Sequence, residues 1–440
     1  MLNDSDINLP ILIIGAGIAG IACAQKLQEN GKKVIILEAR SRIGGRIESK
    51  KIGSDFFDLG ASWIHGIDNN PIWDITQKNH IGTTVFNYDN STYFHKNGQV
   101  FSDKEAQEFE SYINKIDNLL SHTQKISALD AIKEIIFSLN YSGNIFSESY
   151  LKKLLLSSFE RIANDPFATN LNLLSANYKN YEGYFEGDEV VFPKGYYQVI
   201  EALSKNLEIK VNVDVKKINY ENDHIKILDC DNKTYWGSRV VVTVPLGILK
   251  KNHIEFYPPL ASDYIHSIQK IGFGSFNKVF FELERPLTFR LENSAENISD
   301  FYWNDSGCFN ILDLSKIYQK PIYLMLFGGD ISDFIDSSTD SEVSDFVFRS
   351  LQKQFDKIPN TPKKIIVTRW GVDPYSYGSF SFPSLNHSDD IVKILHKPIK
   401  KRVFFAGEHC SLKYAGTVHG AYLSGYETAQ EILKQISAPT

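Results

Sequence analysis

Residues 11–46 constrain the fold more than any other stretch of the chain; they read ILIIGAGIAGIACAQKLQENGKKVIILEARSRIGGR. The apolar run Ile11–Ile14 predicts a strand, and the residues after it predict a helix that reaches about Glu29. A second apolar strand, Val34–Leu37, follows and closes with Glu38. Strand, helix and strand in this order predict a parallel βαβ unit.

The turn between the first strand and the helix carries the pattern Gly15-x-Gly17-x-x-Gly20. Glycines there allow a tight turn and a close approach of the backbone to a pyrophosphate, which the amino terminus of the helix then faces. Glu38 stands about where a carboxylate would meet a ribose hydroxyl. We therefore predict an α/β fold that binds a dinucleotide; in the alternative reading, the glycines serve only a tight turn.

The length and charge of the chain set limits on the rest. A chain of 440 residues suits two domains, or one domain interrupted by another. A formal charge of −6 without a long basic run does not suggest a nucleic-acid partner. No stretch suits a membrane span, and the amino terminus lacks the layout of a signal peptide. Four cysteines without paired spacing indicate neither disulfides nor a zinc site, so we expect a cytoplasmic protein.

Weaker patterns predict the remaining elements. Ser102-x-x-Glu105 and Thr339-x-x-Glu342 resemble capping boxes, and each would open a helix. Further helices are expected at 127–139, at 148–160 and from about 417, and strands at 209–213, 224–229, 239–244, 322–327 and 403–405.

Residues 271–283, IGFGSFNKVFFEL, predict an apolar strand with a lysine in its middle. Alternation places Lys278 on one face with Phe276 and Phe280, while Val279 and Phe281 take the other. Neither face is polar. Taken alone, the pattern favours an edge strand whose lysine limits pairing and reaches water.

Five segments together resemble the flavin-containing amine oxidases, with polyamine oxidases most similar. They are the 11–46 segment with its RIGGR ending, FDLGASWIHGIDNNP (57–71), the Lys278 strand, RWGVDPYSYGSFSF (369–382) and FAGEHCSLKYAGTVHGAYLSG (405–425). The resemblance implies FAD rather than NAD as the cofactor. It also implies a Rossmann-like FAD-binding domain and an interleaved α+β substrate-binding domain. The FAD-binding domain would comprise 1–90, 190–285 and 385–440, and the substrate-binding domain 91–189 and 286–384.

The resemblance assigns FAD contacts along the chain. Glu38 would hold the adenosine ribose, Arg46 the pyrophosphate, and Glu408 the ribityl chain or pyrophosphate, while Trp370 would line the flavin ring. The full predicted set is Gly15, Gly17, Gly20, Glu38, Ala39, Arg40, Gly45, Arg46, Ala61, Ser62, Trp63, Val215, Trp370, Gly407, Glu408, Thr417 and Val418. Ser379 stands where monoamine oxidases carry the cysteine that bonds the flavin, so FAD should be non-covalent.

The resemblance also makes Lys278 an active-site residue, which would hold a water against the reactive flavin nitrogen and replaces the edge-strand reading. Phe380 would form one wall of the amine pocket, and the other wall falls at Thr417, where this chain has no aromatic side chain. His65 would lie near the substrate amine. Carboxylates could meet distal ammonium groups; the candidates are Glu160, which we prefer, Glu182, Glu186 and Asp188.

The expected reaction is oxidation of a polyamine by hydride transfer to flavin, giving an aldehyde, a shorter amine and, with dioxygen, hydrogen peroxide. A monomer or a homodimer is expected. An L-amino-acid oxidase is the first alternative; it needs an arginine to clamp a carboxylate, and Arg161, Arg290 and Arg349 are available. Histone demethylation fits less well, because that branch carries a long helical insertion and an extra module. A flavin-binding interaction protein without turnover is the alternative from another class.

Overall fold

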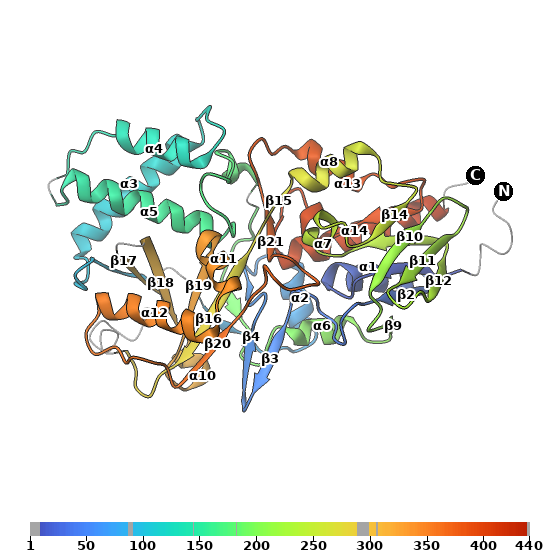
Figure 1. The fold of residues 1–440 in the computed structure, drawn as a ribbon, viewed down its shortest axis with the longest axis horizontal. Helices are drawn as coiled ribbons and strands as arrows, with labels where there is room; N and C mark the ends of the chain where they lie inside the picture. The colour runs from blue at the N-terminus through green and yellow to red at the C-terminus, as the bar shows by residue number, and fades with distance from the viewer. Residues whose placement is uncertain are drawn as a thin grey trace.

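The structure is a computed structural model that describes residues 9–86, 91–143, 145–181, 183–287, 299–304 and 307–437. Glu182 and Arg290, named above as candidates, lie outside these residues. Figure 1 shows two groups of elements: one around helices α1 and α14, and one that contains helices α3, α4 and α5 with strands β16–β19.

A parallel five-stranded sheet forms the centre of the first group. Its strands, in spatial order, are β22 (Val403–Phe405), β13 (Arg239–Val242), β1 (Ile11–Ile14), β2 (Val34–Leu37) and β9 (Ile209–Lys210). Helix α1 (Ile18–Glu29) connects β1 to β2, so the predicted βαβ unit is confirmed with its bounds.

Alternate residues of β1 reach the two faces of this sheet. Ile11 and Ile13 pack with α1, α6 (Tyr197–Leu203) and α14 (Val418–Ser437). Leu12 and Ile14 pack toward an antiparallel group that also has one parallel pair. This group contains β12 (Thr234–Gly237), β11 (Ile225–Asp229), β10 (Val215–Asn219) and β14 (Glu255–Tyr257). Both faces are covered, which is why the parallel strands are almost wholly apolar.

Helices α1 and α14 pack at very short range. A Cβ added to Gly425 of α14 would overlap the carbonyl oxygen of Ala19 in α1. The small residues on α14 therefore serve, at this point, close packing between two helices. The remaining helices of this half are α2 (Pro71–Lys78), α7 (Leu246–Lys250), α8 (Ser262–Lys270) and α13 (Asp389–His396), with a short 3₁₀ turn at Glu408–Cys410.

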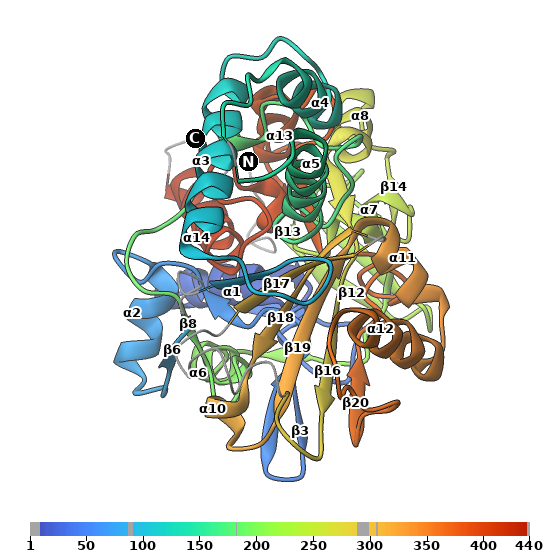
Figure 2. The ribbon, with the colours of Figure 1, turned by 90° about the vertical axis from the view of Figure 1, so that its left-hand side faces the viewer.

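A six-stranded sheet forms the centre of the second group. Its strands, in spatial order, are β20 (Lys364–Val367), β16 (Phe276–Glu282), β19 (Ile322–Gly328), β18 (Gly307–Asp313), β17 (Ser299–Asn304) and β7 (Ser91–Phe94). Figure 2 shows β17, β18, β19, β16 and β20 side by side, with α11 (Gly329–Ser337) and α12 (Asp340–Gln354) near β16 and β20. Strand β16 lies inside the sheet, paired with β19 and β20, so the edge-strand reading is wrong.

Helices α3 (Asp103–Leu120), α4 (Ala128–Ser138) and α5 (Glu148–Asn164) share an apolar cluster. Both predicted capping boxes are present, at Ser102–Glu105 before α3 and at Thr339–Glu342 before α12. The other short elements are α10 (Ser315–Tyr318), a 3₁₀ turn at Tyr178–Tyr181, and the strands β3 (Ser49–Ile52), β4 (Asp55–Asp58), β5 (Trp63–Ile64), β6 (Thr84–Val85), β8 (Val190–Val191), β15 (Gly272–Gly274) and β21 (Phe380–Phe382).

The mixed α/β character is confirmed, and the division into two domains stays a prediction. Strand β16 lies in the 190–285 segment, yet it pairs with strands from 322–328 and 364–367. Among the residues that the structure describes, we find no helix with the length and apolar character needed to cross a bilayer.

Candidate active site

The amino terminus of α1 faces open space. Gly17 occupies the N-cap position, and no side chain caps the first turn, so its backbone N–H groups are available. A Cβ added to Gly17 would meet nothing within 4 Å. At Gly20, by contrast, it would overlap the carbonyl oxygen of Gly15. Gly20 therefore serves packing, while Gly17 leaves room for something outside the protein.

The RIGGR loop lies beside this open turn. Gly44 N donates to the carbonyl oxygen of Ala16 at 2.8 Å, and a Cβ on Gly45 would lie 3.4 Å from the Cα of Gly17. Gly45 itself has φ of 58°, a conformation that glycine adopts without strain. Two glycine-rich backbones thus meet where the helix dipole attracts an anion.

Glu38 lies at the end of β2 and is buried. Its Oε2 accepts a hydrogen bond from Ala16 N at 2.7 Å, and its Oε1 accepts one from Arg40 N at 2.9 Å. Arg40 in turn pairs with Asp373 at 2.5 Å. Ala39 lies between these residues, and Val215 begins β10 just after Val213, whose N–H donates to the carbonyl oxygen of Glu38. The predicted adenosine contacts are therefore brought together.

A buried carboxylate, Glu408, joins three other segments. Its Oε1 accepts from Arg46 at 2.8 Å, and its Oε2 accepts from Gly416 N at 2.9 Å and from the Ser381 hydroxyl. Burial alone would raise the pKa of Glu408, but Arg46, His409 and the Ser381 hydrogen bond together hold this pKa below its usual value. The carboxylate therefore stays ionised and fixes Arg46 beside the glycine-rich turns.

Lys278 is buried with its ammonium pointing toward residues 58–62. Its Nζ donates to the carbonyl oxygens of Asp58 at 3.0 Å and Gly60 at 2.6 Å, and to the hydroxyl of Ser62. It also lies 5.2 Å from the centre of the Trp63 ring. Burial lowers the pKa of Lys278, and the nearby charge of Asp58 opposes that shift only in part. A lysine with a lowered pKa in such surroundings is a functional-site candidate.

Trp370 and Lys278 meet the same short segment. Trp370 Nε1 donates to the carbonyl oxygen of Leu59 at 2.9 Å, next to the Gly60 oxygen that Lys278 contacts. A Cβ on Gly60 would lie 3.3 Å from the Trp370 ring and would overlap the carbonyl oxygen of Arg46. Ala61 N also donates to that Arg46 oxygen at 3.1 Å. The residues predicted to line the flavin and those predicted to hold its pyrophosphate therefore share one piece of backbone.

Phe380 lies beside the start of α14. A Cβ on Gly416 would lie 3.5 Å from the Phe380 ring, and Thr417 follows directly. The Thr417 hydroxyl donates to the carbonyl oxygen of Tyr414 at 2.8 Å and accepts from Gly420 N at 2.9 Å, so it caps the helix that Val418 begins. Ser379 is also engaged: its hydroxyl accepts from Phe276 N at 2.8 Å and donates to the Phe276 carbonyl at 3.0 Å.

His65 stands at the end of strand β5, half exposed, with its ring stacked on Trp63. Its Nδ1 lies 3.2 Å from Oε1 of Glu189, just before β8. Glu186 is exposed, and its carbonyl oxygen accepts from Asp68 N at 2.8 Å, so its loop lies against the loop that follows His65. Carboxylates thus gather near the predicted amine site.

The arginine and carboxylate candidates on α5 face other partners. Arg161 forms an ion pair with Asp165 at 2.5 Å and lies over the Phe301 ring at 4.6 Å. Glu160 is exposed; burial of part of its surface raises its pKa, and Lys133 of α4 lowers it. Arg349 on α12 is exposed and lies 3.5 Å from Asp345. Neither described arginine contacts the segments around Lys278 in the hydrogen bonds above.

Sequence reasoning missed Glu189, Ser381 and Asn277. Glu189 faces His65 because β8 pairs with β5 in antiparallel register, and no local pattern reveals that pairing. Ser381 follows Phe380 on β21 and bonds Glu408 across a long stretch of sequence. Asn277 precedes Lys278, and its full burial in a strand was the available signal.

These features fit a dinucleotide such as FAD. The open position at Gly17, the uncapped helix terminus and the fixed Arg46 suit a pyrophosphate, and the Glu38 oxygens suit a ribose. A profile described as "Flavin containing amine oxidoreductase" matches residues 18–433. The chain belongs to this family. It is therefore an FAD-dependent amine oxidase.

The chain is similar to curated members of the flavin amine oxidoreductase family over nearly its whole length. It is 28% identical to probable polyamine oxidase 4 of Arabidopsis thaliana, with 99% of this chain and 89% of that protein covered. It is 28% identical to polyamine oxidase 3 of Oryza sativa subsp. japonica, with 96% and 88% covered. It is also 28% identical to human lysine-specific histone demethylase 2, with 97% of this chain but 53% of the demethylase covered.

Proposed function

We propose that this amine oxidase acts on polyamines such as spermine, spermidine or their acetylated forms. The observation that carries the proposal is the character of the side chains around His65, where Glu189 contacts the imidazole and the loop of Glu186 lies against the next turn. Carboxylates attract the distal ammonium groups of a polyamine, whereas a carboxylate substrate would need a cation. The match to two polyamine oxidases over almost their full length supports the same choice.

The residues of the chain would bind and orient the amine. Phe380 would form one wall of the pocket, and Thr417, held by its capping bonds, would leave the opposite side open to a secondary amine. The ammonium of Lys278 would hold a water near the reacting atoms. When bound, FAD supplies the acceptor for the hydride that leaves the carbon next to the amine nitrogen.

The products would be an aldehyde and a shorter amine, and reoxidation by dioxygen would yield hydrogen peroxide. Three further expectations stay predictions: the use of dioxygen, a monomeric or homodimeric state, and a cytoplasmic location.

A peroxide-coupled assay tests the substrate class. Spermine, spermidine, their acetylated forms, simple monoamines, neutral L-amino acids and a methylated-lysine peptide would be compared at equal concentration. The highest kcat/KM for a polyamine supports the proposal, and activity should rise with pH as the amine loses its proton. The highest value for an amino acid would favour the L-amino-acid oxidase alternative instead.

The peptide arm addresses demethylation, which the similarity to human lysine-specific histone demethylase 2 raises. The shorter coverage of that protein speaks for polyamines. Turnover of the peptide with none of the polyamines would contradict the proposed substrate class while leaving the amine oxidase family intact.

A further inference from the structure

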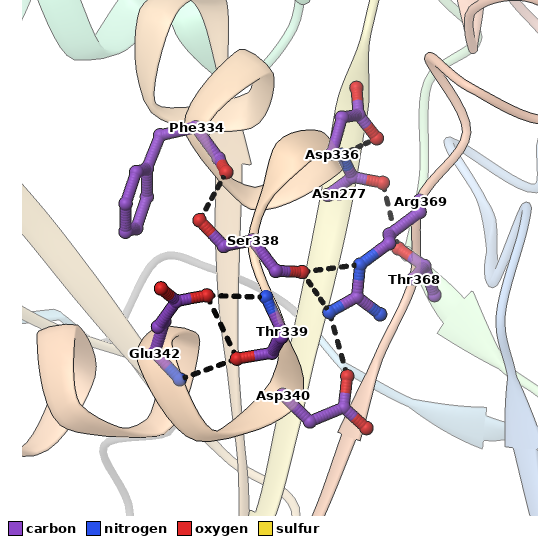
Figure 3. A network of polar contacts seen from close by, with 9 residues as sticks. All are labelled: Asn277, Phe334, Asp336, Ser338, Thr339, Asp340, Glu342, Thr368 and Arg369. Carbon is purple, nitrogen blue, oxygen red and sulfur yellow. Dashed lines mark hydrogen bonds and ion pairs between the residues drawn. The ribbon is translucent and has the colours of Figure 1, made fainter.

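Asn277 is completely buried, and its side-chain amide uses both of its oxygen lone pairs and both of its N–H groups (Figure 3). Its Nδ2 donates to the Ser332 hydroxyl and to Asp336 Oδ1, each at 2.8 Å. Its Oδ1 accepts from Trp370 N at 2.9 Å and from the Thr368 hydroxyl at 3.1 Å. A buried amide that is fully satisfied fixes the groups around it.

The partners of Asn277 come from two elements on either side of β16. Ser332 and Asp336 belong to helix α11, and Thr368 and Trp370 follow strand β20. Asp336 strengthens the connection, because its carboxylate also accepts from the Ser275 hydroxyl at 2.7 Å and from Gly371 N at 3.2 Å. Figure 3 shows Asn277 between Asp336 and Thr368, and Arg369 turned away toward Ser338 and Asp340.

Lys278 and Trp370 are thus joined twice. At the backbone, Asn277 precedes Lys278 and accepts from Trp370 N, and Lys278 N donates to the Thr368 hydroxyl at 2.8 Å. At their side-chain ends, Trp370 donates to Leu59 and Lys278 donates to the adjacent Gly60. We call this the Asn277 circuit: Asn277, Trp370, Leu59, Gly60 and Lys278.

We propose that Asn277 is a positioning residue that sets the distance between the Lys278 ammonium and the Trp370 ring at the flavin. The inference rests on the proposed function, because it gives both side chains their place beside the cofactor. Asn277 cannot touch substrate, since it is wholly enclosed by β16, α11 and the Trp370 loop. It acts by holding two residues that can.

An amide is required at this position because it both donates and accepts. Aspartate has the same shape, yet it would replace Nδ2 with an oxygen facing the Asp336 carboxylate, where Asn277 now donates at 2.8 Å. Two acceptors at that distance repel, whether by charge or by lone pairs. Helix α11 would separate from β16, and the Trp370 loop would move with it.

The test compares Asn277→Asp with the double variant Asn277→Asp/Asp336→Asn, which exchanges the donor and the acceptor. Asn277→Asp should bind FAD but change the visible circular dichroism of the flavin, and it should slow flavin reduction by the best amine about tenfold. The double variant should recover both signals to within about twofold of the wild type. Recovery by exchange is not expected of a residue that only adds bulk to the core.

Asp340→Asn is the matched control. It removes the 2.7 Å ion pair of Arg369, the residue before Trp370, without touching the Asn277 circuit. Its flavin spectrum and reduction rate should equal those of the wild type. If Asn277→Asp does not fold, Asp336→Ala takes its place, because it removes the α11 anchor and should show the same spectral change.

A wild-type flavin spectrum and reduction rate in Asn277→Asp would overturn the proposal, as would a loss in both that the double variant does not recover. The flavin spectrum needs no amine. A changed spectrum together with a wild-type protein that oxidises no polyamine would therefore support the positioning role and reject only the proposed substrate class.

Discussion

Lys278 is a buried cation that is held by two carbonyl oxygens and a hydroxyl rather than by a carboxylate hydrogen bond. Lys278→Met keeps the length and the apolar stem but removes the ammonium. The variant should fold and bind FAD, because Val279 and Phe281 keep their packing on the opposite face. Flavin reduction by amine, or reoxidation by dioxygen, should slow about tenfold or more, which is about 1.4 kcal/mol of barrier per factor of ten.

Stopped-flow absorbance separates these two half-reactions. Lys364→Met is the control, since Lys364 lies on the neighbouring strand β20 with its ammonium over the Phe57 ring at 5.8 Å. It should leave both rates unchanged. Wild-type rates in both half-reactions of Lys278→Met would show that the lysine has only a structural role.

His409 is a second buried titratable residue, and neither of its ring nitrogens has a hydrogen-bond partner in the described part of the chain. Burial lowers the pKa of His409 from 6.5 to about 4, against the opposing charge of Glu408. Between these pH values the unfolded chain binds a proton that the folded protein does not. The free energy of unfolding should therefore fall as the pH decreases from about 6.5 toward 4.

His409→Leu should reduce that slope by up to about 1.4 kcal/mol per pH unit, since one proton is no longer exchanged. Urea unfolding of the FAD-loaded protein at pH 7, 6 and 5 measures it. Cys410→Ala, at the adjacent buried position, should lower stability equally at every pH. An unchanged slope in His409→Leu would mean that another group takes up the proton.

At the scale of elements, the amino terminus of α1 separates folding from cofactor binding. Gly17→Ala places a methyl group where no protein atom lies within 4 Å, and φ of −75° suits alanine. The apoprotein should be as stable as the wild type, whereas FAD affinity should fall about tenfold or more because the methyl occupies the approach to the helix terminus.

Gly20→Ala is the opposite case. Its methyl would overlap the Gly15 carbonyl, so the apoprotein itself should lose stability, by about 1–3 kcal/mol. Gly82→Ala, which also meets no protein atom within 4 Å, should change neither quantity. Titration of apoprotein with FAD and thermal unfolding report the two effects. Equal FAD affinity in Gly17→Ala would place the pyrophosphate elsewhere.

Elements with a local signal could be predicted from the sequence. Strands β1 and β2 and the capping boxes at Ser102 and Thr339 are found as expected, because alternation, periodicity and caps act within a few residues. The strand expected at 209–213 stops at Lys210, since Val213 N bonds the carbonyl of Glu38 and the chain turns into β10. The inner place of β16 depends on β19 and β20, which the local pattern around Lys278 does not contain.

The candidate site follows the same division. Motifs identified Glu38, Arg46 and Glu408 one by one, and the structure shows the Arg46–Glu408 ion pair that joins two of them. Glu189 had no signal, because its place beside His65 depends on pairing between strands from residues 63–64 and 190–191. Long-range pairing decides such contacts, and periodicity does not report it.

For the whole molecule, FAD should act as a reversible ligand that holds the chain together. Ser379 carries a hydroxyl engaged with Phe276, and no cysteine precedes Phe380, so acid precipitation should release FAD into the supernatant. Excess FAD at 100 times its Kd should add about 2.7 kcal/mol to the stability of the apoprotein. FMN, which lacks the adenosine predicted for Glu38, should add less. Colour retained by the precipitate would contradict the non-covalent assignment.

Thr417 bears on how the pocket of this oxidase can change over many generations. Its hydroxyl bonds both Tyr414 and Gly420, so an aromatic residue at this position would forfeit a helix cap of about 0.5–2 kcal/mol. Serine, asparagine or aspartate would keep the cap. A lineage that acquires a second aromatic wall must therefore first gain stability elsewhere, whereas drift at Phe380 on the facing side leaves the helix untouched.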